Sequence, residues 1–138
     1  MVVIINRQRL RPVNGHLEFI ARALQAMGTS SDVTIVFVRD AAMRKLNRQF
    51  RSRDYATDVL SFPTSAEQFE AENQAQLGEV VISVDRAAAQ AKENGLSFAN
   101  EVRQLILHGL LHLCGYDHET DHGEMNRLEL KLRKKLGI

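Results

Sequence analysis

The most informative stretch of the chain is residues 97–118, SFANEVRQLILHGLLHLCGYDH. Ser97 is a residue type that favours the start of a helix, and the apolar run after it predicts a long, buried helix that continues to about Cys114. Gly115 follows where a helix end needs a residue that tolerates a positive φ. The stretch therefore predicts one long helix with a sharp turn behind it.

Segments of strand and helix surround this helix on both sides. Short β-branched or apolar runs predict strands at 2–5, 32–38, 59–62 and 78–84. Apolar residues at helical spacing predict helices at 16–27, 41–50 and 85–94, and Asp121 with Glu124 resembles a capping box that opens a last helix ending at Leu136. The polar, acidic segment 64–76 predicts a loop or a short ragged helix. This order predicts an α+β fold, with helices packed on a mixed β-sheet of about four strands.

Length and composition limit what the chain can be. Its 138 residues fit one domain, residues 1–138, and 44% apolar with 25% charged residues is an ordinary globular composition. No apolar run approaches the roughly 20 residues of a membrane helix, so we expect no membrane partner. The arginines at 7, 9 and 11 follow the apolar start, which is the wrong order for a signal peptide. Cys114 is the single cysteine, which excludes an internal disulfide, and we expect a cytoplasmic protein.

Three of the five histidines lie within the helix and its turn, at His108, His112 and His118. Residues four apart on a helix point the same way, so His108 and His112 can occupy two positions on one metal ion. The turn at Gly115 can bring His118 back as a third ligand. Three imidazoles leave a tetrahedral Zn²⁺ with one open position for water, which is the catalytic pattern. Cys114 is expected to face the core, His122 to lie on the surface, and His16 to be structural or exposed.

The spacing H-x3-H-x5-H matches the metal-binding helix of the metzincin proteases, so we expect a zincin-like helix. Those proteases carry a glutamate directly after the first histidine as general base, and this chain has Gly109 there. Asp117 and Glu101 are candidate replacements, and the sequence does not choose between them. Asp117 can equally orient a ligand imidazole or stabilise the turn.

Basic residues are concentrated in the first part of the chain. The net charge is +1, yet residues 1–60 carry ten Lys or Arg against five Asp or Glu. Arg44, Arg48 and Arg51 share one face of the helix predicted at 41–50 and its exit, and Met43, Leu46 and Phe50 are expected on the buried side. The arginine face is either solvated or binds phosphate groups, which arginine contacts through a planar fork.

Two blocks of sequence resemble one known family. HGLLHLCGYDH (108–118) and LNRQFRSRDYATDVLSFP (46–63) resemble signatures of the YbeY family of metal-dependent endoribonucleases, also called ribosomal RNA maturation factors. A weaker match is LGEVVIS (77–83), with Glu79 where aspartate is usual. The resemblance runs through the whole chain in order and length. Gly109 is the family's own residue at its position, and Thr57, Asp58 and Ser61 match the second block.

The resemblance implies a function and its residues. It implies one Zn²⁺ held by His108, His112 and His118, a functional arginine at Arg51, and cleavage of single-stranded RNA. The biological role it implies is maturation of small-subunit ribosomal RNA, notably its 3′ end, and ribosome quality control, with the ribosome or its associated proteins as partners. We therefore expect Arg51 and His112 to be catalytic, and Arg44, Arg48 and Arg51 to bind substrate. Whether water or the ribose 2′-hydroxyl attacks stays open.

Two other functions fit parts of the sequence. A zinc metalloprotease-like hydrolase fits the histidine spacing but lacks the glutamate at position 109. A ribosome-associated binding protein with a structural zinc fits the basic face. An occupied fourth metal position would favour the second of these.

Overall fold

The computed structural model describes residues 1–29, 31–64, 76–117 and 119–138. Its strands are β1 (Val2–Asn6), β2 (Asp32–Val38), β3 (Val59–Pro63) and β4 (Gln76–Ser83). Its helices are α1 (Leu17–Ala26), α2 (Asp40–Arg51), α4 (Val84–Asn94), α5 (Phe98–Leu113) and α6 (Glu124–Leu136). The strands form one sheet in the order β1-β2-β4-β3, in which β3 alone runs antiparallel to its neighbour. The predicted α+β fold with a mixed four-stranded sheet is confirmed.

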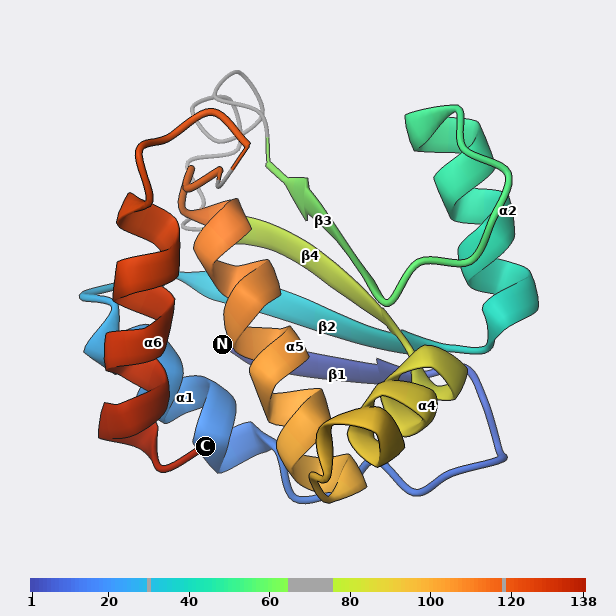
Figure 1. The fold of residues 1–138 in the computed structure, drawn as a ribbon, viewed down its shortest axis with the longest axis horizontal. Coiled ribbons are helices and arrows are strands. Elements are labelled where there is room, and N and C mark those ends of the chain that lie inside the picture. Colours follow the sequence, from blue (N-terminus) through green and yellow to red (C-terminus); the bar gives the residue numbers. More distant parts are fainter. Residues whose placement is uncertain (30, 65–75, 118) are drawn as a thin grey trace.

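Helices cover the two faces of the sheet unequally. In β2 the alternate residues Val33, Ile35 and Phe37 join the main core, which α1, α5 and α6 also fill. The intervening Val36 and Val38 pack in a smaller cluster with Met43 of α2. Alternation along a strand therefore supplies both cores, because successive side chains point to opposite faces. Figure 1 shows α5 in front of the sheet, with α1 and α6 at the left, α4 at the lower right and α2 at the upper right.

The long helix α5 is the centre of the main core. Ser97 caps it as predicted, since the Ser97 side chain accepts a hydrogen bond from the Asn100 backbone at 3.1 Å. At the other end Gly115 has φ 95°, the conformation that the sequence predicted for the turn. In the middle, Gly109 lies against the sheet, and Ser61 Oγ of β3 donates a 3.0 Å hydrogen bond to its carbonyl oxygen. These contacts fix the height and rotation of α5 on the sheet.

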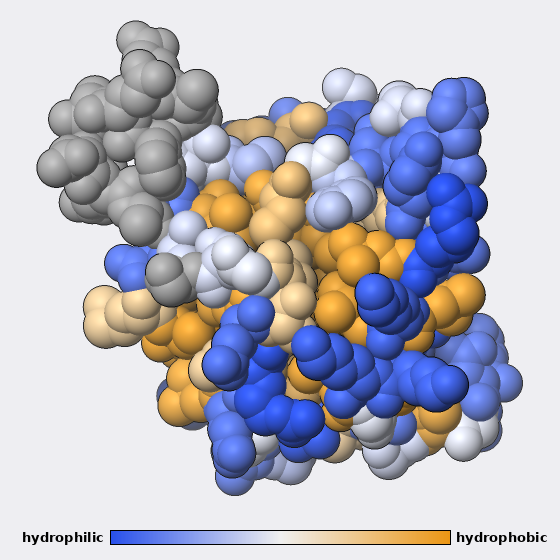
Figure 2. Space-filling model, turned by 90° about the vertical axis from the view of Figure 1, so that its left-hand side faces the viewer, coloured by the Kyte–Doolittle hydropathy of each residue, from blue (hydrophilic) through white to orange (hydrophobic). Residues whose placement is uncertain are grey.

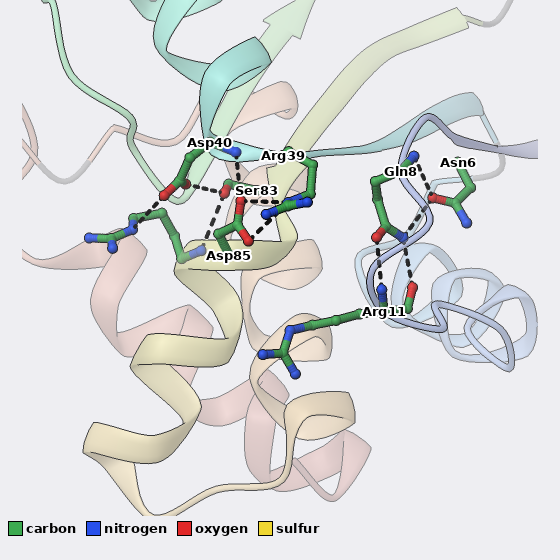
Figure 3. Close-up of polar contacts among 8 residues, drawn as sticks. Asn6, Gln8, Arg11, Arg39, Asp40, Ser83 and Asp85 are labelled. Atoms are coloured by element: carbon green, nitrogen blue, oxygen red, sulfur yellow. Dashed lines mark hydrogen bonds and ion pairs between the residues drawn. The ribbon is translucent and has the colours of Figure 1, made fainter.

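A polar network closes the end of the sheet where the parallel strands finish. Arg39 Nε donates to both carboxylate oxygens of Asp85, at 2.9 and 3.1 Å, and Ser83 Oγ donates to Asp40 at 2.6 Å. Burial alone would raise the pKa of Asp85, but the hydrogen bonds from Arg39 and from the Asp40 backbone hold it below its usual range. Figure 3 shows how these contacts join the start of α2 to the start of α4. Beside them, Gln8 ties the loop after β1 together.

Some expected boundaries and burials differ from the structure. Helix α2 begins at Asp40, one residue before the predicted 41, with Arg39 as its N-cap, and the Asp40 side chain accepts a hydrogen bond from Ser83 Oγ. Phe50 was expected on the buried side but is 55% exposed: its ring packs against Phe62 of β3, and β3 is an edge strand of the sheet. The loop or helix predicted for 64–76 lies almost wholly outside the described residues.

The side of the molecule formed by α1 and α6 mixes apolar and charged groups. Figure 2 shows apolar side chains gathered in the middle of this side, with hydrophilic residues below them and to the right. Leu17 of α1 and Leu130 of α6 are each more than half exposed. None of the helices in the described ranges is long and apolar enough to cross a membrane.

Candidate metal and RNA site

The last two turns of α5 bring two imidazole rings together. His108 Nε2 and His112 Nε2 lie 3.2 Å apart, with the rings at 76° to each other. Two nitrogens on a tetrahedral Zn²⁺, each about 2.05 Å from the metal, are separated by about 3.3 Å. The pair therefore already has the spacing of two ligands on one ion, as the four-residue interval predicted.

A carboxylate on α6 orients the first of these rings. Glu129 Oε1 lies 2.9 Å from His108 Nδ1 and 3.6 Å from Nη2 of Arg133. Burial alone would raise the pKa of Glu129, but the hydrogen bond with His108 and the nearby basic groups lower it by more. An ionised Glu129 keeps the proton of His108 on Nδ1, so Nε2 can bind a metal ion. Carboxylates behind metal-binding histidines commonly fix the ring in this way.

The histidine pair opens into a cavity of about 560 Å³ that is also lined by Arg51. Arg51 ends α2, and the left-handed Ser52, with φ 56°, turns the chain back there. Buried Asn47 holds that turn by donating from Nδ2 to the carbonyl oxygen of Tyr55 at 2.9 Å. Arg51 Nη2 reaches the carbonyl oxygen of Ser61 at 3.4 Å, so the guanidinium lies beside the middle of β3. The structure thus places an arginine and both helix histidines around one cavity.

The two other arginines of the predicted face lie outside this cavity wall. Arg44 makes a two-pronged contact with Asp54, Nε to Oδ1 at 2.8 Å and Nη2 to Oδ2 at 3.1 Å. Arg48 Nη1 lies 3.9 Å from the same carboxylate. The hydrogen bond from Arg44 lowers the pKa of Asp54. Both arginines remain more than half exposed.

The residues considered as a general base have separate positions. The carbon that a side chain would add at Gly109 lies 2.5 Å from Val80 Cγ1, so position 109 faces the sheet and not the histidine rings. Asp117 lines the cavity, and its Oδ1 accepts from the Glu119 backbone at 2.9 Å, which is the turn-stabilising role. Glu101 is buried and lines a second cavity that does not include Arg51 or His112.

Three other residues considered in the sequence analysis differ in how deeply they are buried. Cys114 was expected to face the core but is exposed, because the helix ends at Leu113 and Cys114 belongs to the turn. His122 is exposed, as predicted. His16 is buried beside Phe37, with ring centroids 6.3 Å apart.

Sequence reasoning missed three residues of the site: Glu129, Asn47 and Arg53. Glu129 had a usable signal, since it is a carboxylate on the apolar stripe of α6 between Met125 and Leu132. Arg53 lines the first cavity and contacts the Tyr55 hydroxyl at 3.2 Å, but in the sequence it is one basic residue among many. Asn47 had no signal beyond its place in the second sequence block.

The third predicted ligand, His118, lies outside the described residues. Within the described ranges, no group of three or more His, Cys, Asp or Glu is arranged to hold a metal ion. The described part of the site therefore supplies a pair of nitrogens, and a complete zinc site needs a further ligand.

Fold and site together define a class: an α+β domain in which a helix presents a histidine pair to a cavity that an arginine also lines. The model of a known family, described as Endoribonuclease YbeY, matches residues 4–137. The chain belongs to this endoribonuclease family, which confirms the resemblance drawn from its motifs.

Individual relatives agree with this assignment. The chain is 49% identical to the endoribonuclease YbeY of Nautilia profundicola over 110 residues, which cover 80% of this chain and 76% of that protein. It is 41% identical to the Geobacter metallireducens endoribonuclease YbeY over 141 residues, covering 99% and 94% of the two chains. The solution structure of TM1509 from Thermotoga maritima is similar, with a TM-score of 0.65 and 26% identity over 99% of this chain and 89% of that one.

Proposed function

We propose that residues 1–138 form one hydrolase domain, a zinc-dependent endoribonuclease that cleaves single-stranded RNA. We place its role in the maturation of small-subunit ribosomal RNA at the 3′ end and in ribosome quality control, in the cytoplasm, with the ribosome or its associated proteins as partners. Membership of the endoribonuclease YbeY family supports the reaction class. The observation that carries the proposal is the 3.2 Å histidine pair, which opens into the cavity lined by Arg51.

The proposed metal ligands are His108, His112 and His118. When bound, Zn²⁺ would lower the pKa of a water molecule and polarise a phosphoryl oxygen. Glu129 would keep His108 in the tautomer that leaves Nε2 for the metal. Arg51, at the rim of the same cavity, would neutralise the negative charge that develops on the phosphate during cleavage.

Arg44 and Arg48 are proposed to bind the RNA backbone beside the cavity. Their contacts with Asp54 are solvent-exposed, and exposed ion pairs contribute only about 0–1 kcal/mol. A phosphate group of the substrate can therefore replace Asp54 at small cost. Such contacts carry no sequence information, so they would hold the RNA strand without selecting it.

Replacing Arg51 with alanine separates metal binding from catalysis. We expect the Arg51→Ala protein to keep its zinc, measured by elemental analysis, and to lose cleavage of a labelled single-stranded RNA by about 10²-fold or more. Arg22→Ala, in α1, serves as a matched control. Loss of zinc to the same extent as activity in Arg51→Ala would contradict the role of Arg51 as a phosphate-binding residue.

The alternative of a metalloprotease has a specific objection in the structure. Gly109 packs on Val80, so a glutamate at that position could not reach the histidine rings without displacing α5 from the sheet. A peptide-cleavage assay on the zinc-loaded protein tests this alternative. Zinc with a filled fourth position and no cleavage of either polymer would support the ribosome-associated binding protein instead.

A further inference from the structure

A second cavity adjoins the first, and Asp58 and His108 line both. It has a volume of about 480 Å³, within the range of small-molecule sites. Its walls come from α4, α5 and α6, together with Leu96 between α4 and α5 and Asp58 just before β3. Of its residues the proposed reaction uses only His108 and Glu129, so the role of the rest of this cavity is open.

Glu101 gives the cavity its chemical character. The residue is only 4% exposed, and its Oε2 accepts a hydrogen bond from Asn94 Nδ2 at 3.3 Å. No ion pair to Glu101 is found among the described residues, whereas Glu129 in the same wall has Arg133 beside it. Glu101 lies in the first turn of α5, where the helix dipole favours a negative charge. This effect offsets only a small part of the free energy that burying a carboxylate costs. Glu101 therefore favours a ligand that donates a hydrogen bond.

The remaining walls fit a flat ring with polar edges. Gln90 and Gln104 contribute amide groups, and Asp58 Oδ2 orients the first by accepting from Gln90 Nε2 at 3.2 Å. Leu96 and Leu105 supply apolar surface beside these groups. Amides and carboxylates are the side chains that read base edges, and a carboxylate accepts in particular from an exocyclic amino group.

We propose that this cavity holds one base of the RNA strand, and that Glu101 selects bases whose pairing edge carries an amino group, cytosine, adenine or guanine, over uracil. The inference rests on the proposed ribonuclease function. Uracil presents a carbonyl oxygen where cytosine presents its amino group, so its pairing edge offers the Glu101 carboxylate a single N3–H donor flanked by two repelling acceptor oxygens. The shared residues Asp58 and His108 allow one strand to pass from the first cavity into the second.

Binding tests the proposal without cleavage. Metal-free protein is titrated into fluorescent 2′-O-methyl hexamers of cytidine, adenosine or uridine, and anisotropy gives the affinities. We expect cytidine and adenosine to bind about tenfold more tightly than uridine. Glu101→Gln should reduce that ratio to about threefold or less, because the amide both donates and accepts. Glu93→Gln, at an exposed position of the same cavity-forming helix α4, should leave the ratio unchanged.

Further variants keep the test decisive. Gln104→Glu adds a second carboxylate to the wall and should increase discrimination against uridine, even if Glu101→Gln folds poorly. Equal base preference in the wild type and both variants would overturn the base pocket. Cleavage of single-stranded RNA by the zinc-loaded protein is measured alongside. If the protein cleaves RNA but Glu101 has no effect on base preference, the base pocket is rejected and the proposed function stands. If base preference depends on Glu101 but no RNA is cleaved, the proposed function is rejected and the pocket stands.

Discussion

Replacing Gly109 with alanine tests how closely the histidine helix is pressed on the sheet. The added carbon would lie 2.5 Å from Val80 Cγ1, 3.1 Å from Val80 Cγ2 and 3.3 Å from Ser61 Oγ. Val80 is completely buried in the main core and has no space to retreat. The sheet or α5 must therefore move, and α5 carries both histidines.

The size of the effect follows from two opposing contributions. In an exposed helix, glycine to alanine stabilises by about 0.8–1.0 kcal/mol. Overpacking a tight core costs about 1–3 kcal/mol, and contact with the rigid Val80 favours the upper half of that range. We expect Gly109→Ala to lower the free energy of unfolding by about 1–2 kcal/mol, and the melting temperature by about 3–8 °C.

Urea unfolding of the metal-free protein, followed by circular dichroism, measures the loss without a contribution from bound metal. Val80→Ala removes the two nearest of the three atoms that the new carbon would meet. The double variant should therefore be more stable than the sum of the single losses predicts, by about 1 kcal/mol or more. An alanine at 109 that stabilises the protein, or two variants whose effects simply add, would refute the close packing of α5 on Val80.

Three other predictions concern the site and its surroundings. Glu129→Gln should weaken zinc binding about 10–100-fold in a competition titration with a chelator, while Lys131→Gln on the outer face of α6 should have no effect; equal affinities would contradict the orienting role of Glu129. Burial, helped by the charge of Arg103, lowers the pKa of His16 from 6.5, so the unfolded chain binds this proton first as the pH falls. The free energy of unfolding should be highest above pH 6.5 and decline below it by up to about 1.4 kcal/mol per pH unit. His16→Gln should remove this part of the pH dependence. An unchanged pH dependence of urea unfolding in that variant would show that His16 does not contribute. Asp54→Asn should tighten binding of metal-free protein to single-stranded RNA about two- to fivefold by releasing Arg44 and Arg48, and weaker binding would argue against contacts between these arginines and the RNA.

Local signals allowed most of the fold to be predicted from the sequence. Ser97 and Gly115 marked the ends of α5 because capping and positive φ are properties of single residues. The strand at 32–38 was predicted with its observed bounds, since its β-branched residues supply both cores. Phe50 was misjudged because its exposure depends on where the sheet ends, which a helix's own periodicity does not contain.

The sequence predicted those parts of the site that depend on the geometry of a single helix. The approach of His108 to His112 follows from their spacing along α5. Glu129 was missed because it reaches His108 from α6, and the packing of two helices decides that contact. The separation of Glu101 from Asp117 into different cavities likewise depends on how α4 and α6 lie beside α5.

The most direct test of a metal-dependent ribonuclease is cleavage of a labelled single-stranded RNA by the zinc-loaded protein, beside a His112→Ala variant purified in the same way. We predict that the zinc-loaded protein cleaves the RNA, and that the His112→Ala variant neither holds zinc nor cleaves. Equal cleavage by both would contradict it, because the activity would then not depend on the histidine pair of α5.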